Sequence, residues 1–309
     1  PDVFGAIVQF PNADGSIEDY KEFIAKANAN ETRVAVAADL MSLVLLTPPG
    51  EWGADVVFGS SQRFGIPMFY GGPSAAYFAT KDEYKRAIPG RIIGISKDAY
   101  GHPAYRLALQ TREQHIKREK ATSNICTAQA LLATMAGFYA VYHGAEGLRN
   151  IAGRIHASAG FLAAELEKLG YRQLNKDYFD TLKIELPAHV SVNALREIAL
   201  ECKVNLRYFE GGQVGISIDE TTQPTDIGVL LYIFAGAAGK DYMLEEAIPE
   251  KTYFDQKFAR TSDFLQEDVF KKYGNRADAL YHPSGTQRRI IGTVDDLPGI
   301  MYDETERCI

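Results

Sequence analysis

The chain has 309 residues and a formal net charge of −7, with hydrophobic and charged fractions of 46% and 24%. The length predicts two domains with a substantial core, and the acidic balance argues against nucleic acid or an anionic membrane surface as a partner. Three cysteines (Cys126, Cys202 and Cys308) have neither metal nor redox spacing, which fits a reducing compartment such as the cytoplasm.

The first 60 residues predict strands that alternate with a helix. Residues 3–10 form an apolar run that predicts a buried strand. Ser16, followed by Asp19 three residues later, is a candidate N-cap for a helix that runs to about residue 28. Further strands are predicted at residues 33–38 and 54–58. This order is typical of a parallel α/β sheet.

The middle of the chain predicts two short strands and two helices. The strands lie at residues 74–80 and 91–96, and the charged segment 81–86 between them should form a solvated helix. A buried helix is predicted at residues 127–142, and His143-Gly144 should break it. The next helix, at residues 148–169, is long enough to bridge two domains.

After residue 171 the pattern changes to that of a compact α+β domain, with strands at 180–186, 204–208 and 213–218 and helices at 191–203 and 225–238. The longest apolar run, residues 227–239, is too short to span a bilayer. We therefore expect a large domain at 1–147, an interdomain helix with a small domain at 148–247, a linker at 248–273 and a poorly packed tail at 274–309.

The segment from Gly53 to Ser74 is the most informative part of the sequence. It resembles the active-site hairpin of pyridoxal-phosphate enzymes, in which an A-D-apolar-apolar strand precedes a His-Lys or Ser-Lys pair and a glycine-rich loop. At the place of the lysine stand Gln62 and Arg63. A guanidinium stays protonated and cannot form an imine, so we expect no covalent attachment of the cofactor to this chain.

Asp39 follows the predicted strand 33–38, at the edge where parallel α/β sheets bind ligands. An aspartate there could pair with the pyridine nitrogen of pyridoxal phosphate, although a strand-end aspartate that caps a loop is the more common case. Thr122, Ser123 and Asn124 precede a predicted helix and could bind a phosphate or simply cap that helix.

A basic run lies just before these three residues, and its members are Arg112, His115, Lys117, Arg118 and Lys120. Such a run is usually a solvated face, but here it could line an anionic pocket or contact an acidic partner, with Arg112, His115 and Arg118 as the candidates for a partner cleft. Four other histidines (His102, His143, His156 and His189) have no partner at metal or triad spacing. We expect them to be caps or surface residues, and we expect no metal site.

Three sequence runs, GSSQRFGIPMFYGGPSAAYFATKDEYKRA, PGRIIGISKDAYG and YRLALQTREQHIKREKATSNICTAQ, make the chain similar to one family. It resembles, over roughly residues 3–273, the N-terminal half of the glycine cleavage system P-protein, glycine dehydrogenase (decarboxylating). The resemblance implies an aminotransferase-like pyridoxal-phosphate fold (fold type I), with a large domain incomplete at its N-terminus and a small α+β domain.

The resemblance also implies a function. P-proteins have two homologous halves, or two subunits, and only the second carries the lysine that binds pyridoxal phosphate. There glycine loses its carboxylate as CO₂, and the aminomethyl group passes to the lipoyl arm of the H-protein. This chain would be the non-catalytic half of such a dimer in the cytoplasm, or in the mitochondrial matrix of a eukaryote. Gln62 and Arg63 are then the expected residues.

Two departures from the family concern the ends of the chain. The family begins with elements upstream of Val3, so we expect the chain, which opens at Pro1, to be a fragment. After Tyr273 the family continues with H-T-E-T-E-L-M-R-Y, whereas this chain reads GNRADALYHP. Reading allowed codons of residues 274–279 one base later gives E-T-E-L-M, so we expect residues 274–309 to be a frameshift product. A smaller departure is Ser74, where the family usually has histidine.

Two alternatives remain open. The chain could be a free-standing pyridoxal-phosphate enzyme that uses another lysine, such as Lys97 or Lys120, although neither is predicted at a strand end facing Asp39. It could also be a pure interaction module, which would leave the resemblance of residues 53–74 to a lysine hairpin unexplained.

Overall fold

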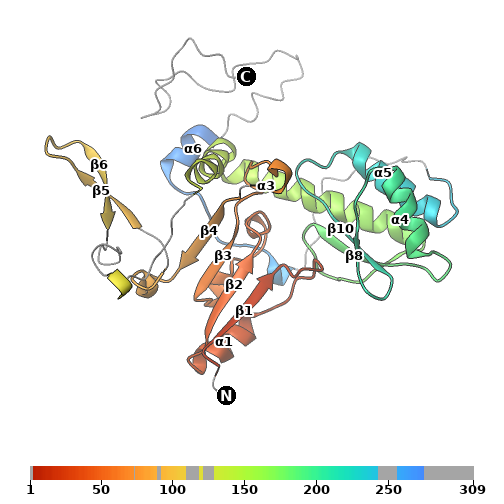
Figure 1. Cartoon of the computed structure of the whole chain (residues 1–309), viewed down its shortest axis with the longest axis horizontal. Helices are drawn as coiled ribbons and strands as arrows, with labels where there is room; N and C mark the ends of the chain where they lie inside the picture. Colours follow the sequence, from red (N-terminus) through yellow and green to blue (C-terminus); the bar gives the residue numbers. More distant parts are fainter. Residues whose placement is uncertain are drawn as a thin grey trace, which may run out of the picture.

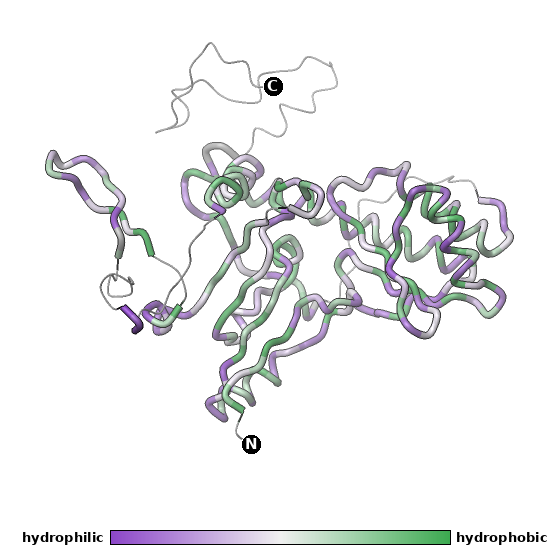
Figure 2. Tube along the Cα trace, viewed as in Figure 1, coloured by the Kyte–Doolittle hydropathy of each residue, from purple (hydrophilic) through white to green (hydrophobic). Residues whose placement is uncertain are grey.

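The computed structural model describes residues 3–72, 74–88, 92–108, 118–120, 129–242 and 256–274. A large domain, built on one sheet, and a small domain are joined by one long helix, and a two-stranded hairpin projects away from both (Figure 1). Apolar residues follow the strands of the large sheet and the helices of the small domain (Figure 2). Among the described residues, no helix is long and apolar enough to cross a membrane.

The sheet of the large domain has the order β1-β2-β3-β4, with β1 at Gly5–Phe10, β2 at Arg33–Ala38, β3 at Val56–Ser60 and β4 at Ala76–Thr80. The first three strands are parallel, and β4 runs antiparallel to β3. Alternate residues of β2 (Val34, Val36 and Ala38) are buried, as expected for a strand with one face on the core. Strand β4 lies within the strand predicted at residues 74–80, whereas its antiparallel pairing with β3 was not predicted.

Two sequence-based predictions for this domain need correction. Helix α1 spans Lys21–Ala29 and does not begin at Ser16, whose backbone instead forms a β-bridge with Tyr178 of the small domain. Strand β1 is not buried on both faces, because Ile7 is 74% exposed at this edge of the sheet. Both differences arise from long-range contacts, or from their absence, which a local pattern does not contain.

Short 3-10 helices connect the strands of this domain: η1 at Ser42–Val44, η2 at Pro49–Trp52, η3 at Phe69–Gly71 and η4 at Asp82–Tyr84. The last of these is all that forms where a charged helix was predicted at residues 81–86, so that prediction was too long. After η4 comes the projecting hairpin, with β5 at Ile92–Lys97 and β6 at Pro103–Ala108. The sequence predicted β5 but not β6.

Helix α3 (Ala130–Lys168) joins the two domains. The predicted break is confirmed at Gly144, whose φ of 60° and ψ of −175° depart from helical geometry. Glycine accepts this conformation without a steric penalty. The segment after the break is packed on one side with small and apolar residues such as Ala152, Ile155 and Leu162, all buried.

The small domain contains a four-stranded sheet of order β7-β8-β10-β9, whose neighbours are all antiparallel. Its elements are β7 (Arg172–Gln173), β8 (Thr181–Glu185), α4 (Val192–Glu201), β9 (Arg207–Tyr208), β10 (Gln213–Ser217) and α5 (Pro224–Ala237). Ser191 caps α4 by accepting a hydrogen bond from the Ala194 backbone N–H at 3.0 Å. The predicted strands and helices match β8, α4, β10 and α5 closely, whereas β9 covers only the end of the strand predicted at 204–208 and β7 was not predicted.

The segment predicted as a linker at 248–273 is in part integrated into the large domain. It includes η6 (Gln256–Phe258) and α6 (Asp268–Gly274). Phe258 is buried, its carbonyl accepts from the Thr47 backbone N–H at 2.8 Å, and the Arg260 backbone N–H donates to Leu45 at 2.7 Å. Residues 243–255 and 275–309 lie outside the described residues, so the predicted frameshift tail stays a prediction.

Candidate functional site

Asp39 lies directly after β2, at the carboxyl end of the parallel strands. Its carboxylate accepts hydrogen bonds from the backbone N–H groups of Met41 at 3.3 Å and Ser42 at 3.0 Å. The Ser42 hydroxyl donates to the Asp39 carbonyl at 2.8 Å. Asp39 therefore does what the simpler interpretation of the sequence predicted, since it caps the loop that leads into η1.

Arg63, in the loop after β3, contacts the same carboxylate. Its Nη1 donates to Asp39 Oδ2 at 3.0 Å and also to the carboxylate of Asp180, which belongs to the small domain. The guanidinium carbon lies 5.4 Å from the centre of the Phe179 ring. We call Asp39, Arg63 and Asp180 the Arg63 cluster. Its cation comes from one of the two residues at the predicted lysine position, and it links the loop after β2 to the small domain.

The electrostatics of the Arg63 cluster are those of a mostly buried group of charges. Burial raises the pKa of Asp39, Arg63 opposes this, and the neighbouring Asp180 adds to it. Burial would lower the pKa of Arg63, but the two carboxylates outweigh it and raise the net value. Arg63 therefore remains a cation, and Asp39 is disposed to take up a proton on acidification.

The rest of the Arg63 side chain offers no reactive group. Its Nε and Nη2 are buried and have no hydrogen-bond partner among the described residues. The neighbouring Gln62 is used locally, because its Nε2 donates to the Ile66 carbonyl at 2.8 Å and its backbone N–H donates to Ser60 Oγ at 3.1 Å. Of the two residues at the place of the lysine, one closes the turn and the other pairs with Asp39.

A close approach of β3 to β2 supports this end of the sheet. A Cβ on Gly59 would lie 2.2 Å from the Ala38 carbonyl oxygen and 2.9 Å from Cε1 of Tyr77, so only glycine fits. The Tyr77 hydroxyl donates to the same carbonyl at 2.8 Å. Burial, together with the nearby Asp39, raises the pKa of Tyr77, which therefore stays protonated.

Asp55, the aspartate of the A-D-apolar-apolar pattern, has a structural task. Its side chain is almost fully buried and accepts from the Val34 backbone N–H at 2.8 Å, Lys81 Nζ at 2.8 Å and the Tyr84 hydroxyl at 3.1 Å. Burial would raise its pKa, but the hydrogen bonds, above all that from Lys81, lower it. Asp55 thus ties β3 to β2 and to the chain after β4.

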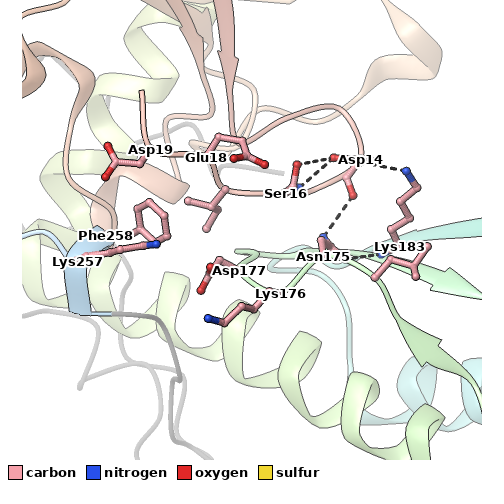
Figure 3. A pocket seen from close by; sticks show the side chains of 12 residues that line it. Asp14, Ser16, Glu18, Asp19, Asn175, Lys176, Asp177, Lys183, Lys257 and Phe258 are labelled. Carbon is pink, nitrogen blue, oxygen red and sulfur yellow. Dashed lines mark hydrogen bonds and ion pairs between the residues drawn. The ribbon is translucent and has the colours of Figure 1, made fainter. Parts of the chain in front are cut away.

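A polar cavity of about 480 Å³ lies at the junction of the two domains (Figure 3). Asp14 accepts hydrogen bonds there from Ser16 and from Lys183 Nζ at 3.2 Å, which links the loop after β1 to β8. The residues that line the cavity are mostly charged: Asp14, Ser16, Ile17, Glu18, Asp19, Leu174, Asn175, Lys176, Asp177, Lys183, Lys257 and Phe258. No local pattern in the sequence indicates this cavity, because two of its sides, residues 14–19 and 174–183, are more than 150 positions apart.

Several predicted site residues cannot be placed. Thr122, Ser123, Asn124, Arg112 and His115 lie outside the described residues. Arg118 begins η5 (Arg118–Lys120) with a φ of 51°.

The histidines were expected to be caps or surface residues, and one of them is not. His156 is buried in α3, where its Nδ1 lies 2.7 Å from the Phe179 carbonyl oxygen. His143 is half-buried beside Tyr139 and Tyr142, and burial lowers its pKa. Among the described residues, no group of His, Cys, Asp or Glu side chains is arranged to hold a metal ion.

Comparison with known proteins gives one consistent result. A family model described as glycine cleavage system P-protein matches residues 1–234. A glycine dehydrogenase (decarboxylating) of Bacteroides thetaiotaomicron is 60% identical over 297 residues, which are 96% of this chain and 31% of that protein. One from Nostoc punctiforme is 53% identical over 284 residues, 90% of this chain and 29% of that protein. The chain thus spans about 31% of the length of the first of these relatives.

Solved structures show the same relationship. A glycine decarboxylase (P-protein) of the glycine cleavage system, in inhibitor-bound form, has a TM-score of 0.70 and 32% identity, over 76% of this chain and 55% of that chain. An alanine–glyoxylate aminotransferase from Nostoc sp., at 15% identity and a TM-score of 0.53 over 76% of this chain and 61% of that one, shows the fold alone. The aminotransferase-like fold predicted from the sequence is confirmed.

Proposed function

The chain belongs to the glycine cleavage system P-protein family, and from that premise we propose that it supports, without catalysing, the pyridoxal-phosphate-dependent decarboxylation of glycine. Its partner is a lysine-bearing half of the same family, and the aminomethyl group passes from that half to the lipoyl arm of the H-protein. We place this dimer in the cytoplasm, or in the mitochondrial matrix of a eukaryote.

The observation that carries the proposal is the contact between Arg63 and Asp39. In this fold, a cofactor that binds covalently needs a lysine amine near the aspartate that pairs with its ring. Here the cation in contact with Asp39 is a guanidinium, which cannot form an imine, and Asp39 is already engaged by two backbone N–H groups. The residues present do not fit covalently held pyridoxal phosphate, so the cofactor belongs to the partner half.

The role that we assign to this chain is structural. The Arg63 cluster and the contacts of Asp14 with Lys183 hold the small domain against the large one. A half held in one arrangement can form a fixed wall for a partner's active site, where pyridoxal phosphate supplies an electron-poor ring for the decarboxylation. Asp39, Thr122, Ser123 and Asn124 are then remnants of a site, and Arg112, His115 and Arg118 are candidates to face the shared cleft.

The alternative of a free-standing enzyme that uses Lys97 has less support. Lys97 is the last residue of β5, on the projecting hairpin, and that hairpin is a sheet separate from the one that carries Asp39. Lys120 lies in η5, at the end of a short stretch whose neighbours on both sides lie outside the described residues. An interaction module without any link to the enzyme would not account for the family match over residues 1–234.

The test is a chimera of the Bacteroides thetaiotaomicron glycine dehydrogenase (decarboxylating) in which the matching segment is replaced by residues 3–273 of this chain. We expect the chimera to release CO₂ from glycine in the presence of H-protein, and the 309-residue chain with pyridoxal phosphate to release none. Release of CO₂ by the chain alone contradicts the proposal, as does a folded chimera without activity.

A further inference from the structure

The hairpin formed by β5 and β6, residues 92–108, projects clear of both domains (Figure 1). We call it the arm. Its two strands form a sheet of their own, and a two-stranded hairpin without further support is only marginally stable in water. An element of this kind normally gains its stability by packing against something else.

One face of the arm is apolar and exposed. The register pairs Ile95 with Tyr105 and Lys97 with Pro103, so their side chains share this face with Ile93. Ile93 is 56% exposed, Ile95 79% and Tyr105 82%. The opposite face carries the pairs Ile92–Ala108, Gly94–Arg106 and Ser96–Ala104, so apart from Ile92 its residues are small or polar. The burial pattern of β5 alternates accordingly.

The turn of the arm is ordered by its own hydrogen bonds. The backbone N–H groups of Tyr100 and His102 both donate to Asp98 Oδ1, at 2.8 Å and 2.9 Å, and Gly101 has the left-handed φ of 86° that closes the turn. A β-hairpin that already has its bound conformation loses less conformational entropy on binding. The arm therefore has the properties of a preformed binding element with one apolar face.

We propose that the apolar face of the arm (Ile93, Ile95 and Tyr105) docks on the lysine-bearing half of the P-protein. This inference rests on the proposed function and deepens it by assigning a surface to the pairing. The curated relatives are about three times as long as this chain, because the chain spans 31% of the first of them. In that relative, and in the chimera described above, the rest of the protein is on the same polypeptide as the matching segment. It is therefore present at a high effective concentration and reaches an exposed arm before a second copy does.

The experiment places a photoreactive benzophenone amino acid at Tyr105 in the chimera described above, with the same replacement at Ser96 on the opposite face as the matched control. Irradiation followed by peptide mapping identifies what lies against each face. We expect position 105 to cross-link to the lysine-bearing half and position 96 not to do so. The substitution Ile95→Lys should lower the yield from position 105 at least about tenfold, whereas Ser96→Lys should leave it unchanged.

Other results would overturn the proposal. Cross-links from position 105 to a second copy of the chimera would identify a different occupant. Equal yields from the two faces, or products confined to this half, would remove the arm from the pairing surface. In each of these cases the chimera can still release CO₂, so the cross-linking result tests the docking of the arm independently of the proposed function. Circular dichroism of each variant shows that it remains folded.

Discussion

Replacing Arg63 by methionine is the most informative perturbation of this fold. The side chains of Arg63, Asp39 and Asp180 are 18%, 26% and 13% exposed, so the cluster is mostly shielded from water. Removing one partner from a buried ion pair generally costs about 3–5 kcal/mol. Here Asp39 can take up a proton and so limit the unpaired charge, which places the expected loss in the free energy of unfolding at about 3 kcal/mol.

The assay can use the single tryptophan of the chain, Trp52, which packs edge-on against Phe10 in the large domain with ring centroids 4.7 Å apart. Urea unfolding followed by its fluorescence gives the free energy of unfolding of the unit that contains Asp39. Arg172→Met is the matched control, because Arg172 forms an exposed ion pair with Glu185, and we expect it to change the stability by less than about 0.5 kcal/mol.

The pH dependence of the Arg63→Met variant supplies a second check. Burial already raises the pKa of Asp39, and loss of the Arg63 cation should raise it further. A carboxyl with a raised pKa in the folded state contributes stability at low pH, and this contribution is lost as the pH rises through that pKa. The deficit of the variant should therefore be smaller at about pH 4.5 than at about pH 7. A deficit below about 0.5 kcal/mol at pH 7 would refute the structural role of Arg63.

Three further predictions concern the large domain and the end of the chain. Gly59→Ala should cost about 1–3 kcal/mol of unfolding free energy, because the added Cβ would lie 2.2 Å from the Ala38 carbonyl oxygen. The control Gly50→Ala should be nearly neutral, because its Cβ would have no atom within 4 Å. Equal effects of the two variants would contradict the close approach of β3 to β2. Asp55→Asn should cost about 2 kcal/mol at pH 7. Because the pKa of Asp55 is lowered from 3.8, its contribution is present above that value and lost as the pH falls through the lower folded pKa, so acid titration of the stability should be shallower in the variant. Sequencing the gene across the codon of Tyr273 should show a shifted reading frame, and an intact frame that encodes residues 274–309 refutes this. The match to the Bacteroides thetaiotaomicron protein covers 96% of the chain and therefore extends into residues 274–309, so the gene sequence is the deciding observation.

Local patterns in the sequence predicted much of the fold. Strand β2 was predicted with its observed bounds, because a short apolar run ends there at Asp39, and the break at Gly144 followed from the glycine at that point. Strand β6 was missed although it pairs with β5 along its whole length. It begins at Pro103, which weakens a strand signal, and the pairing depends on the turn at Asp98.

The candidate site was predicted in part. Asp39 and Arg63 were singled out because of their places after two strands, but nothing local indicated that Asp180, 117 positions after Arg63, would join them. The spacing of Ser16 to Asp19 predicted a helix cap, yet the backbone of Ser16 forms a β-bridge with Tyr178 and so joins the two domains. His156 could have been found from its position among small and apolar residues on one face of a long helix.

On the proposed function, this chain supports a cofactor that it does not itself bind covalently. The most direct measurement is peptide mapping of the chimera after pyridoxal phosphate has been added and reduced onto the protein with borohydride. We predict a single reduced adduct, on the lysine of the half that follows this segment, and none on residues 3–273. An adduct on Lys97, Lys120 or any other lysine of this chain, at a yield comparable to that of the partner half, would contradict the account.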